Sequence, residues 1–214
     1  MPSSPTAPSA VSVEPAFVRY LAAVSVIAAI LASPLRTGAQ GKPPHTSTRP
    51  LAAQLNEAFP GDTRRILEHA DSLSLLSLAP DRPTWENVTD RAGRHHQLPL
   101  KSVPGPDADI LVLGEVVIKS RQQRRQIIGS LYDSIARATI GSACFEPHHA
   151  IRTIRKGKSI VIVICFGCGN AYVYSGKGSK EISGFMVARG NYAATFDKIL
   201  RDNKVPIATK SGGT

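Results

Sequence analysis

The clearest pattern in the chain is the largely apolar run over residues 109–119 (DILVLGEVVIK). Its β-branched residues predict a strand, and Gly114 within it predicts a β-bulge. Earlier, leucines alternate with serines from Leu73 to Leu78 with one slip in phase, which predicts another strand. After Ser120, a predicted helix cap, apolar residues recur at helical spacing and predict a helix of about 18 residues. These residues are Ile127, Ile128, Leu131, Ile135 and Ala138.

The C-terminal half predicts a three-stranded antiparallel meander. Its strands are expected over residues 150–155, 159–166 and 171–174, with turns at 156–158 and 167–170. The middle strand is apolar on both faces. Val161, Val163 and Cys165 should lie on one face, and Ile160, Ile162 and Ile164 on the other. We therefore expect this strand to be central in the sheet and covered on both sides.

Four further elements are predicted from weaker patterns. Asp62 is a predicted cap for a short helix, and Asn191 for a last one. Residues 185–188 are expected to add a strand. Residues 80–107 are polar, with five prolines and two glycines, and are interpreted as a long loop.

The expected elements follow the order helix, strand, strand, helix, three strands, helix. This order indicates an α+β fold, in which an antiparallel sheet of about 4–6 strands carries helices packed on one face and follows an N-terminal hydrophobic segment. The chain divides into a disordered N-terminus over 1–16, a signal peptide or membrane anchor over 17–39, a linker over 40–60, the α+β domain over 61–208 and a tail over 209–214.

The N-terminal hydrophobic segment predicts export. Residues 21–32 are apolar except for Ser25, and small residues follow up to Ala39, a predicted cleavage point. This length is typical of a secretory signal and short for a membrane span, which needs about 20 residues. A retained anchor and a buried helix are the alternatives. Because no Lys or Arg precedes Phe17, we also consider translation from Val18, which would leave residues 1–16 and Phe17 untranslated. The expected location is the periplasm, the exterior or the inner membrane.

The 26 Lys and Arg residues exceed the 16 Asp and Glu residues, giving a formal charge of +10. A basic surface favours anionic partners such as lipid head groups, nucleic acid or an acidic protein. Two basic groups stand out in the sequence. They are Arg121, Arg124 and Arg125 at a helix start, and Arg152, Arg155, Lys156 and Lys158 on one hairpin. Export and the scarcity of neighbouring aromatic residues argue against nucleic acid, and solvated faces are the preferred interpretation.

The candidate chemistry is a group of cysteines and histidines. Cys144, His148 and His149 precede the first meander strand, and Cys165-Phe-Gly-Cys168 occupies a turn about twenty residues later. The hairpin between them has arms of similar length, so its two ends should lie side by side. We therefore expect the three sulfurs and one histidine nitrogen within reach of a single site.

Three interpretations of this cluster remain open. Zinc takes four thiolate or imidazole ligands, which Cys144, His149, Cys165 and Cys168 would supply. Alternatively, a disulfide from Cys144 to one of the other two cysteines would pin the loop to the sheet, or the cysteines would be buried thiols. The third interpretation is a reactive thiol, which is less expected because a C-x-x-C pair normally opens a helix, whose N-terminus lowers the thiol pKa.

The runs Cys-Phe-x-Pro-x-His and Ile-Cys-Phe-x-Cys, preceded by Val-Leu-Gly and a basic helix, resemble a family of bacterial exported proteins of uncharacterised activity. The resemblance covers residues 66–206 and includes Leu76-Ser77-Leu78-x-Pro80. In that family an Arg stands where this chain has His148, so the resemblance favours His149 as the carried-over position. It implies a bacterial source and an exported domain, and no activity.

The sequence contains no phosphate-binding glycine loop, no Gly-x-Ser-x-Gly elbow and no His-Glu-x-x-His helix. The leading interpretation is therefore a non-enzymatic exported domain that binds an envelope or protein partner and contacts the membrane only if its N-terminal segment is uncleaved. Its Cys/His cluster would be structural. A zinc-binding module is the second interpretation, with zinc as its cofactor, and a thiol-dependent enzyme is the third.

Overall fold

The computed structural model describes residues 49–176 and 180–208. The predictions for residues 1–16, 17–39 and 209–214 concern segments outside these described residues. The same holds for the part of the predicted linker that precedes Arg49.

The domain is built on an antiparallel sheet of seven strands in the order β4-β5-β1-β6-β7-β8-β9. The strands are β1 (Ser72–Ala79), β4 (Ser102–Val103), β5 (Ile110–Val117), β6 (His149–Arg155), β7 (Lys158–Cys165), β8 (Asn170–Ser175) and β9 (Glu181–Met186). The α+β class and the meander β6-β7-β8 are confirmed. The sheet is larger than the expected 4–6 strands, because the two-residue β4 adds an edge that no local pattern marks.

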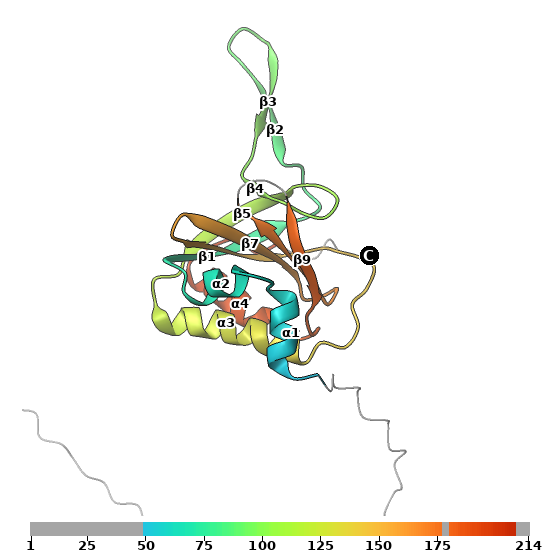
Figure 1. The fold of residues 1–214 in the computed structure, drawn as a ribbon. Coiled ribbons are helices and arrows are strands. Elements are labelled where there is room, and N and C mark those ends of the chain that lie inside the picture. The colour runs from blue at the N-terminus through green and yellow to red at the C-terminus, as the bar shows by residue number, and fades with distance from the viewer. Residues whose placement is uncertain (1–48, 177–179, 209–214) are drawn as a thin grey trace, which may run out of the picture. The chain divides into compact units, whose positions relative to one another are not determined.

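Four helices of the described chain pack on one face of this sheet (Figure 1). They are α1 (Leu51–Ala58), α2 (Thr63–Glu68), α3 (Arg121–Ala136) and α4 (Ala193–Asp202). All four contribute to one apolar core together with that face of the sheet, as predicted. Helix α1 falls inside the predicted linker 40–60, yet Leu55, Ala58 and Phe59 are buried. The domain therefore begins before the expected boundary at residue 61.

Strand β7 is covered on both faces, as its composition predicts. Ile160, Ile162 and Ile164 pack in the core beneath the helices. Val161 and Val163 pack on the opposite face, in a second apolar cluster formed with residues of β1, β5, β6 and β8. Because β6 and β8 flank it, β7 also holds the start of the β7–β8 turn in place.

A bulge lies between β1 and β5. Ser77 pairs with Gly114, and the next residue, Leu78, pairs with Val112, so Leu113 is the extra residue. This confirms the predicted bulge near Gly114. The predicted slip in the leucine pattern is not a break in β1, which pairs with β6 in continuous register and places Leu73 and Leu75 in one core cluster and Leu76 and Leu78 in the other. A Cβ at Gly114 would lie 2.7 Å from a methyl carbon of Val205. Glycine therefore lets the segment after α4 pack on the sheet.

Residues 80–107 are not the predicted long loop. They contain β4 and a separate two-stranded ribbon of β2 (Trp85–Thr89) and β3 (His95–Pro99), which projects from the sheet (Figure 1). The ribbon is polar and largely exposed on both faces, so it lacks the apolar alternation by which strands are recognised. Its turn depends on Asp90, whose Oδ1 accepts hydrogen bonds from the amides of Ala92 and Arg94.

One of the three predicted capping residues accepts a side-chain hydrogen bond from the first turn of its helix. Ser120 caps α3, its hydroxyl accepting a hydrogen bond from the amide of Gln123. Asp62 makes no capping hydrogen bond to α2, and its carboxylate instead pairs with Lys158. Helix α4 follows Tyr192 rather than Asn191. Asp62 thus occupies the predicted N-cap position of α2 without capping it by a side-chain hydrogen bond. The assignment of Asn191 as the cap of α4 is wrong by one residue, and its backbone carbonyl accepts from the amide of Ala194.

Candidate functional site

Three cysteines meet where the loop before β6 contacts the β7–β8 turn. Cys165 and Cys168 form a disulfide, and the Sγ of Cys144 lies 3.6 Å from the Sγ of Cys168. The three sulfurs thus share one site, as the hairpin geometry predicts. The predicted pairing of Cys144 with one of the other two cysteines is wrong, because the disulfide joins the two cysteines of the same turn.

The local sequence explains this turn. Strand β7 ends at Cys165, and the amide of Gly169 donates to the carbonyl of Cys165 at 2.9 Å. Gly169 has φ +78°, a conformation that glycine adopts without steric cost. The amide of Cys168 donates to the Sγ of Cys165 at 3.0 Å. The chain therefore reverses between the two cysteines instead of continuing as a strand, which brings both sulfurs to one side.

A second set of contacts holds Cys144 against the turn. The amide of Ser142 donates to the carbonyl of Cys168 at 2.8 Å, and the side-chain amide of Asn170 donates to the carbonyl of Ser142 at 2.7 Å. A side chain at Gly141 would collide with the side-chain oxygen of Asn170. The Ser142–Cys144 segment is therefore held on the turn by hydrogen bonds to both the amide and the carbonyl of Ser142.

The three sulfurs differ in their access to solvent. Cys165 is 2% exposed and Cys168 is 3% exposed, whereas Cys144 is exposed and free. The amide of Glu146 donates to the Sγ of Cys168 at 3.2 Å. The buried disulfide is thus flanked by two amide donors, one on each sulfur, and by one solvent-exposed thiol.

His149 lies on the helix-covered face of β6 rather than among the sulfurs. Its Nε2 is 2.8 Å from Oδ1 of Asp197 on α4, and its ring packs between Phe166 and Phe196. The hydrogen bond from His149 lowers the pKa of Asp197 below its usual range. Burial lowers the pKa of the neighbouring His148.

The sulfurs and the His149–Asp197 pair line one pocket of about 560 Å³. Arg189 also lines it and donates to the carbonyl of Cys168 at 3.3 Å. Asp197 and Arg189 were missed by sequence reasoning, because each is a single charged residue with no motif around it. Only the placement of α4 and the segment after β9 reveals their relation to the cysteines.

Within residues 49–176 and 180–208, no three His, Cys, Asp or Glu side chains are arranged to hold a metal ion. In the oxidised state, the disulfide occupies two of the four predicted zinc ligands, and His149 is bonded to Asp197. Zinc binding by Cys144, His149, Cys165 and Cys168 stays a prediction that concerns the reduced protein.

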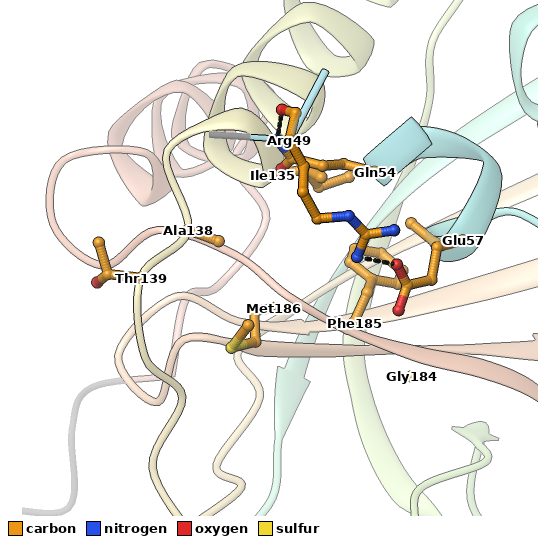
Figure 2. Close-up of a pocket in the computed structure, with 10 residues that line it drawn as sticks. Arg49, Gln54, Glu57, Ile135, Ala138, Thr139, Gly184, Phe185 and Met186 are labelled. Atoms are coloured by element: carbon orange, nitrogen blue, oxygen red, sulfur yellow. Dashed lines mark hydrogen bonds and ion pairs between the residues drawn. The ribbon is translucent and has the colours of Figure 1, made fainter. Parts of the chain in front are cut away.

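A second cavity, of about 400 Å³, lies between α1, the end of α3 and β9. Figure 2 shows Arg49 paired with Glu57 on one side of it, and Ala138, Phe185 and Met186 around the rest. The Arg49–Glu57 distance is 2.7 Å, and both side chains are largely exposed. This cavity brings no nucleophile and no buried titratable group together, so the candidate chemistry remains at the cysteines.

The basic residues that the sequence groups together have separate structural roles. Arg124 donates to the carbonyls of Ile118 and Ala70, each at 2.9 Å. Arg152 pairs with Glu115 at 3.3 Å and Lys158 with Asp62 at 3.1 Å. Three of the seven basic side chains therefore already have protein partners, which favours the interpretation of solvated or structural faces.

No helix among the described residues combines the length and apolar character that crossing a membrane requires. No protein-family model, curated protein or solved structure matches the chain. The functional argument therefore depends on the geometry of the cysteine site.

Proposed function

We propose that the chain is an exported thiol–disulfide exchange protein, in which Cys144 is the reacting thiol and Cys165–Cys168 the exchangeable bond. The observation that carries this proposal is the 3.6 Å separation between the sulfurs of Cys144 and Cys168. At that separation a thiolate is in van der Waals contact with the disulfide sulfur that it would attack. The predicted export of the chain agrees with the proposal, because disulfides persist in oxidising compartments.

The position of the disulfide also supports exchange over a purely structural role. The bonded cysteines are only three positions apart, whereas Cys144 and Cys168 are 24 positions apart. In the loop-entropy model, the short bridge stabilises the fold by roughly 2 kcal/mol and the longer one by roughly 3.5 kcal/mol. Loop entropy therefore does not oppose exchange of the Cys165–Cys168 bond for a Cys144–Cys168 bond.

The internal step exchanges one disulfide bond for another. The Cys144 thiol gives its proton to water, and its thiolate attacks Sγ of Cys168. The Cys144–Cys168 bond forms, the Cys165–Cys168 bond breaks, and Cys165 leaves with the electron pair and takes up a proton. The amide of Cys168, already 3.0 Å from the Sγ of Cys165, stabilises this leaving thiolate, because hydrogen bonds to ionised groups are the stronger ones.

The external step follows from exposure. Cys144 is the exposed sulfur, so a partner thiolate attacks Cys144, and Cys168 leaves as a thiolate beside the amide of Glu146. A second thiol of the partner then displaces Cys144. A partner dithiol becomes a disulfide, and the protein gains two electrons and two protons. The reverse sequence reduces a partner disulfide, so the partner class is a dithiol or disulfide compound.

The test uses the oxidised full-length protein and dithiothreitol under nitrogen, with formation of oxidised dithiothreitol as the readout. Cys144→Ser should slow reduction of the disulfide by about tenfold or more, because the remaining sulfurs are buried. Its melting temperature should stay unchanged. Reduction of Cys144→Ser at the wild-type rate would overturn the proposal and favour a structural cluster in a domain that binds an envelope or protein partner.

Zinc binding is the second candidate, and the same sulfur separation favours it. Two thiolates on a tetrahedral zinc ion at about 2.3 Å lie roughly 3.8 Å apart, close to the 3.6 Å between Cys144 and Cys168. Zinc would require Cys165 and Cys168 to be reduced. One equivalent of zinc retained by the reduced protein in elemental analysis, and lost in Cys144→Ser, would support this candidate.

A further inference from the structure

Ser142 contacts both the thiol and the turn that carries the disulfide. Its Oγ lies 3.1 Å from the Sγ of Cys144 and donates to the carbonyl of Cys168 at 3.0 Å. Its backbone is fixed by the hydrogen bonds to Cys168 and Asn170 described above. The hydroxyl is therefore held against a reacting sulfur by a rigid frame.

A hydroxyl has one hydrogen to donate and two lone pairs to accept with. While Cys144 is a thiol, Ser142 donates to the Cys168 carbonyl and can accept the S–H of Cys144. Once the thiol loses its proton, the same hydroxyl can rotate and donate to the thiolate. The carbonyl of Cys168 still accepts from the amide of Ser142 and from Nη2 of Arg189. After the rotation the Cys168 carbonyl still has hydrogen-bond donors. The rotation therefore does not carry the free-energy cost of an unpaired buried acceptor.

We propose that Ser142 is a catalytic hydrogen-bond donor that stabilises the Cys144 thiolate and aims it at Cys168. This inference rests on the proposed exchange function and names the group that activates its nucleophile. Arg189 and Asn170 support the arrangement as positioning residues, because Arg189 keeps the Cys168 carbonyl hydrogen-bonded and Asn170 fixes the Ser142 backbone.

The hydrogen bond from Ser142 has two opposing effects on the reaction rate of Cys144. A hydrogen bond stabilises a thiolate, but it also lowers the intrinsic nucleophilicity of that thiolate. Because the second effect offsets nearly half of the first on a logarithmic scale, we expect a net effect of about three- to fivefold on reaction rate.

The test measures alkylation of Cys144 by iodoacetamide at neutral pH in the oxidised full-length protein. The disulfide protects the other two cysteines, so Cys144 alone is labelled. Ser142→Ala should slow alkylation by about three- to fivefold, and Ser142→Thr, which keeps the hydroxyl, should stay within about twofold of wild type. Ser183→Ala is the matched control, because its hydroxyl also donates to a backbone carbonyl, that of Ala58, away from the cysteines. It should react like wild type.

Unchanged or faster alkylation in Ser142→Ala would overturn the inference, because a merely structural hydroxyl would loosen the loop and increase access to Cys144. A Ser142→Thr variant as slow as Ser142→Ala would also contradict it. These outcomes are independent of the dithiothreitol experiment. If Ser142→Ala slows alkylation while Cys144→Ser is reduced at the wild-type rate, the activation of Cys144 stands and the exchange function fails.

Discussion

Two antiparallel hairpins of this domain have similar backbone pairing and very different surroundings. The β6–β7 hairpin forms seven residue pairs and the β2–β3 ribbon forms five. β7 is buried from Ile160 to Cys165, whereas β3 is exposed along its whole length. Backbone hydrogen bonds are thus common to both, and burial of apolar side chains distinguishes them. We infer that the β6–β7 hairpin contributes much of the stability of the domain and that the β2–β3 ribbon contributes little.

The contacts within the ribbon are polar and local. A hydrogen bond of 3.0 Å joins Nδ1 of His95 to the hydroxyl of Thr89, and one of 3.1 Å joins Nε2 of His96 to Oδ2 of Asp90. No ribbon residue belongs to either apolar core cluster. A two-stranded hairpin alone is only marginally stable in water, so the ribbon should open locally at a lower free energy than the rest of the domain. The cysteine turn, in contrast, follows a strand that is buried from Ile160 to its last residue, Cys165.

The largest expected effect comes from placing a charge in each hairpin at a valine. Val163→Asp should reduce the free energy of unfolding by about 4 kcal/mol or more, because Val163 is fully buried and the carboxylate would have no partner. That loss is comparable with the whole stability of a small domain. The matched variant Val88→Asp, on the half-buried position of β2, should cost less than about 1 kcal/mol. Urea denaturation measures both. Equal midpoints for Val163→Asp and wild type would show that β7 is not the core of the fold.

A smaller effect is expected from Asp197, which connects the buried end of β6 to α4. Asp197→Asn should cost roughly 1–2 kcal/mol at pH 7, because it replaces a charged hydrogen-bond acceptor of His149. Since His149 lowers the pKa of Asp197 in the folded state, this stability is present above the unfolded pKa, near 3.9, and is lost as pH falls through the folded value.

The stability difference between wild type and Asp197→Asn should therefore narrow as the pH falls below about 4. Denaturation midpoints from pH 7 to pH 2.5 test this dependence. Asp202→Asn is the control, since Asp202 lies on the same helix and makes an exposed ion pair with Lys198. Its effect should be small at every pH. A difference for Asp197→Asn that stays constant with pH would mean that the carboxylate charge does not stabilise the fold.

The contrast between the hairpins also explains what the sequence could predict. Strand β7 and helix α3 were predictable, because their apolar residues recur at the periods of a buried strand and a packed helix. The meeting of Cys144 with the β7–β8 turn followed from the equal arms of β6 and β7. The ribbon was not predictable, because a strand exposed on both faces has no apolar alternation.

The chemistry of the site was only partly predictable for a related reason. The sequence shows which cysteines lie close together, but the choice of disulfide depends on the path of the chain between Cys165 and Cys168. The bond between His149 and Asp197 depends on where α4 packs, 48 positions along the chain. The role of Ser142 depends on contacts with Cys168, 26 positions away. Such long-range polar contacts have no period and therefore no signal in a single sequence.

The smallest effect on global stability is expected from Asp90, whose carboxylate organises the turn of the ribbon. Its oxygens accept hydrogen bonds from two backbone amides and from the side chain of Arg94. Asp90→Ala should therefore increase hydrogen exchange severalfold at the amides of β2 and β3, while the melting temperature of the domain changes by less than about 2 °C. Glu86→Ala, an exposed carboxylate on the same ribbon, is the matched control and should leave exchange unchanged. A fall of many degrees in the melting temperature of Asp90→Ala would show that the ribbon unfolds together with the sheet, and the contrast between the two hairpins would then be wrong.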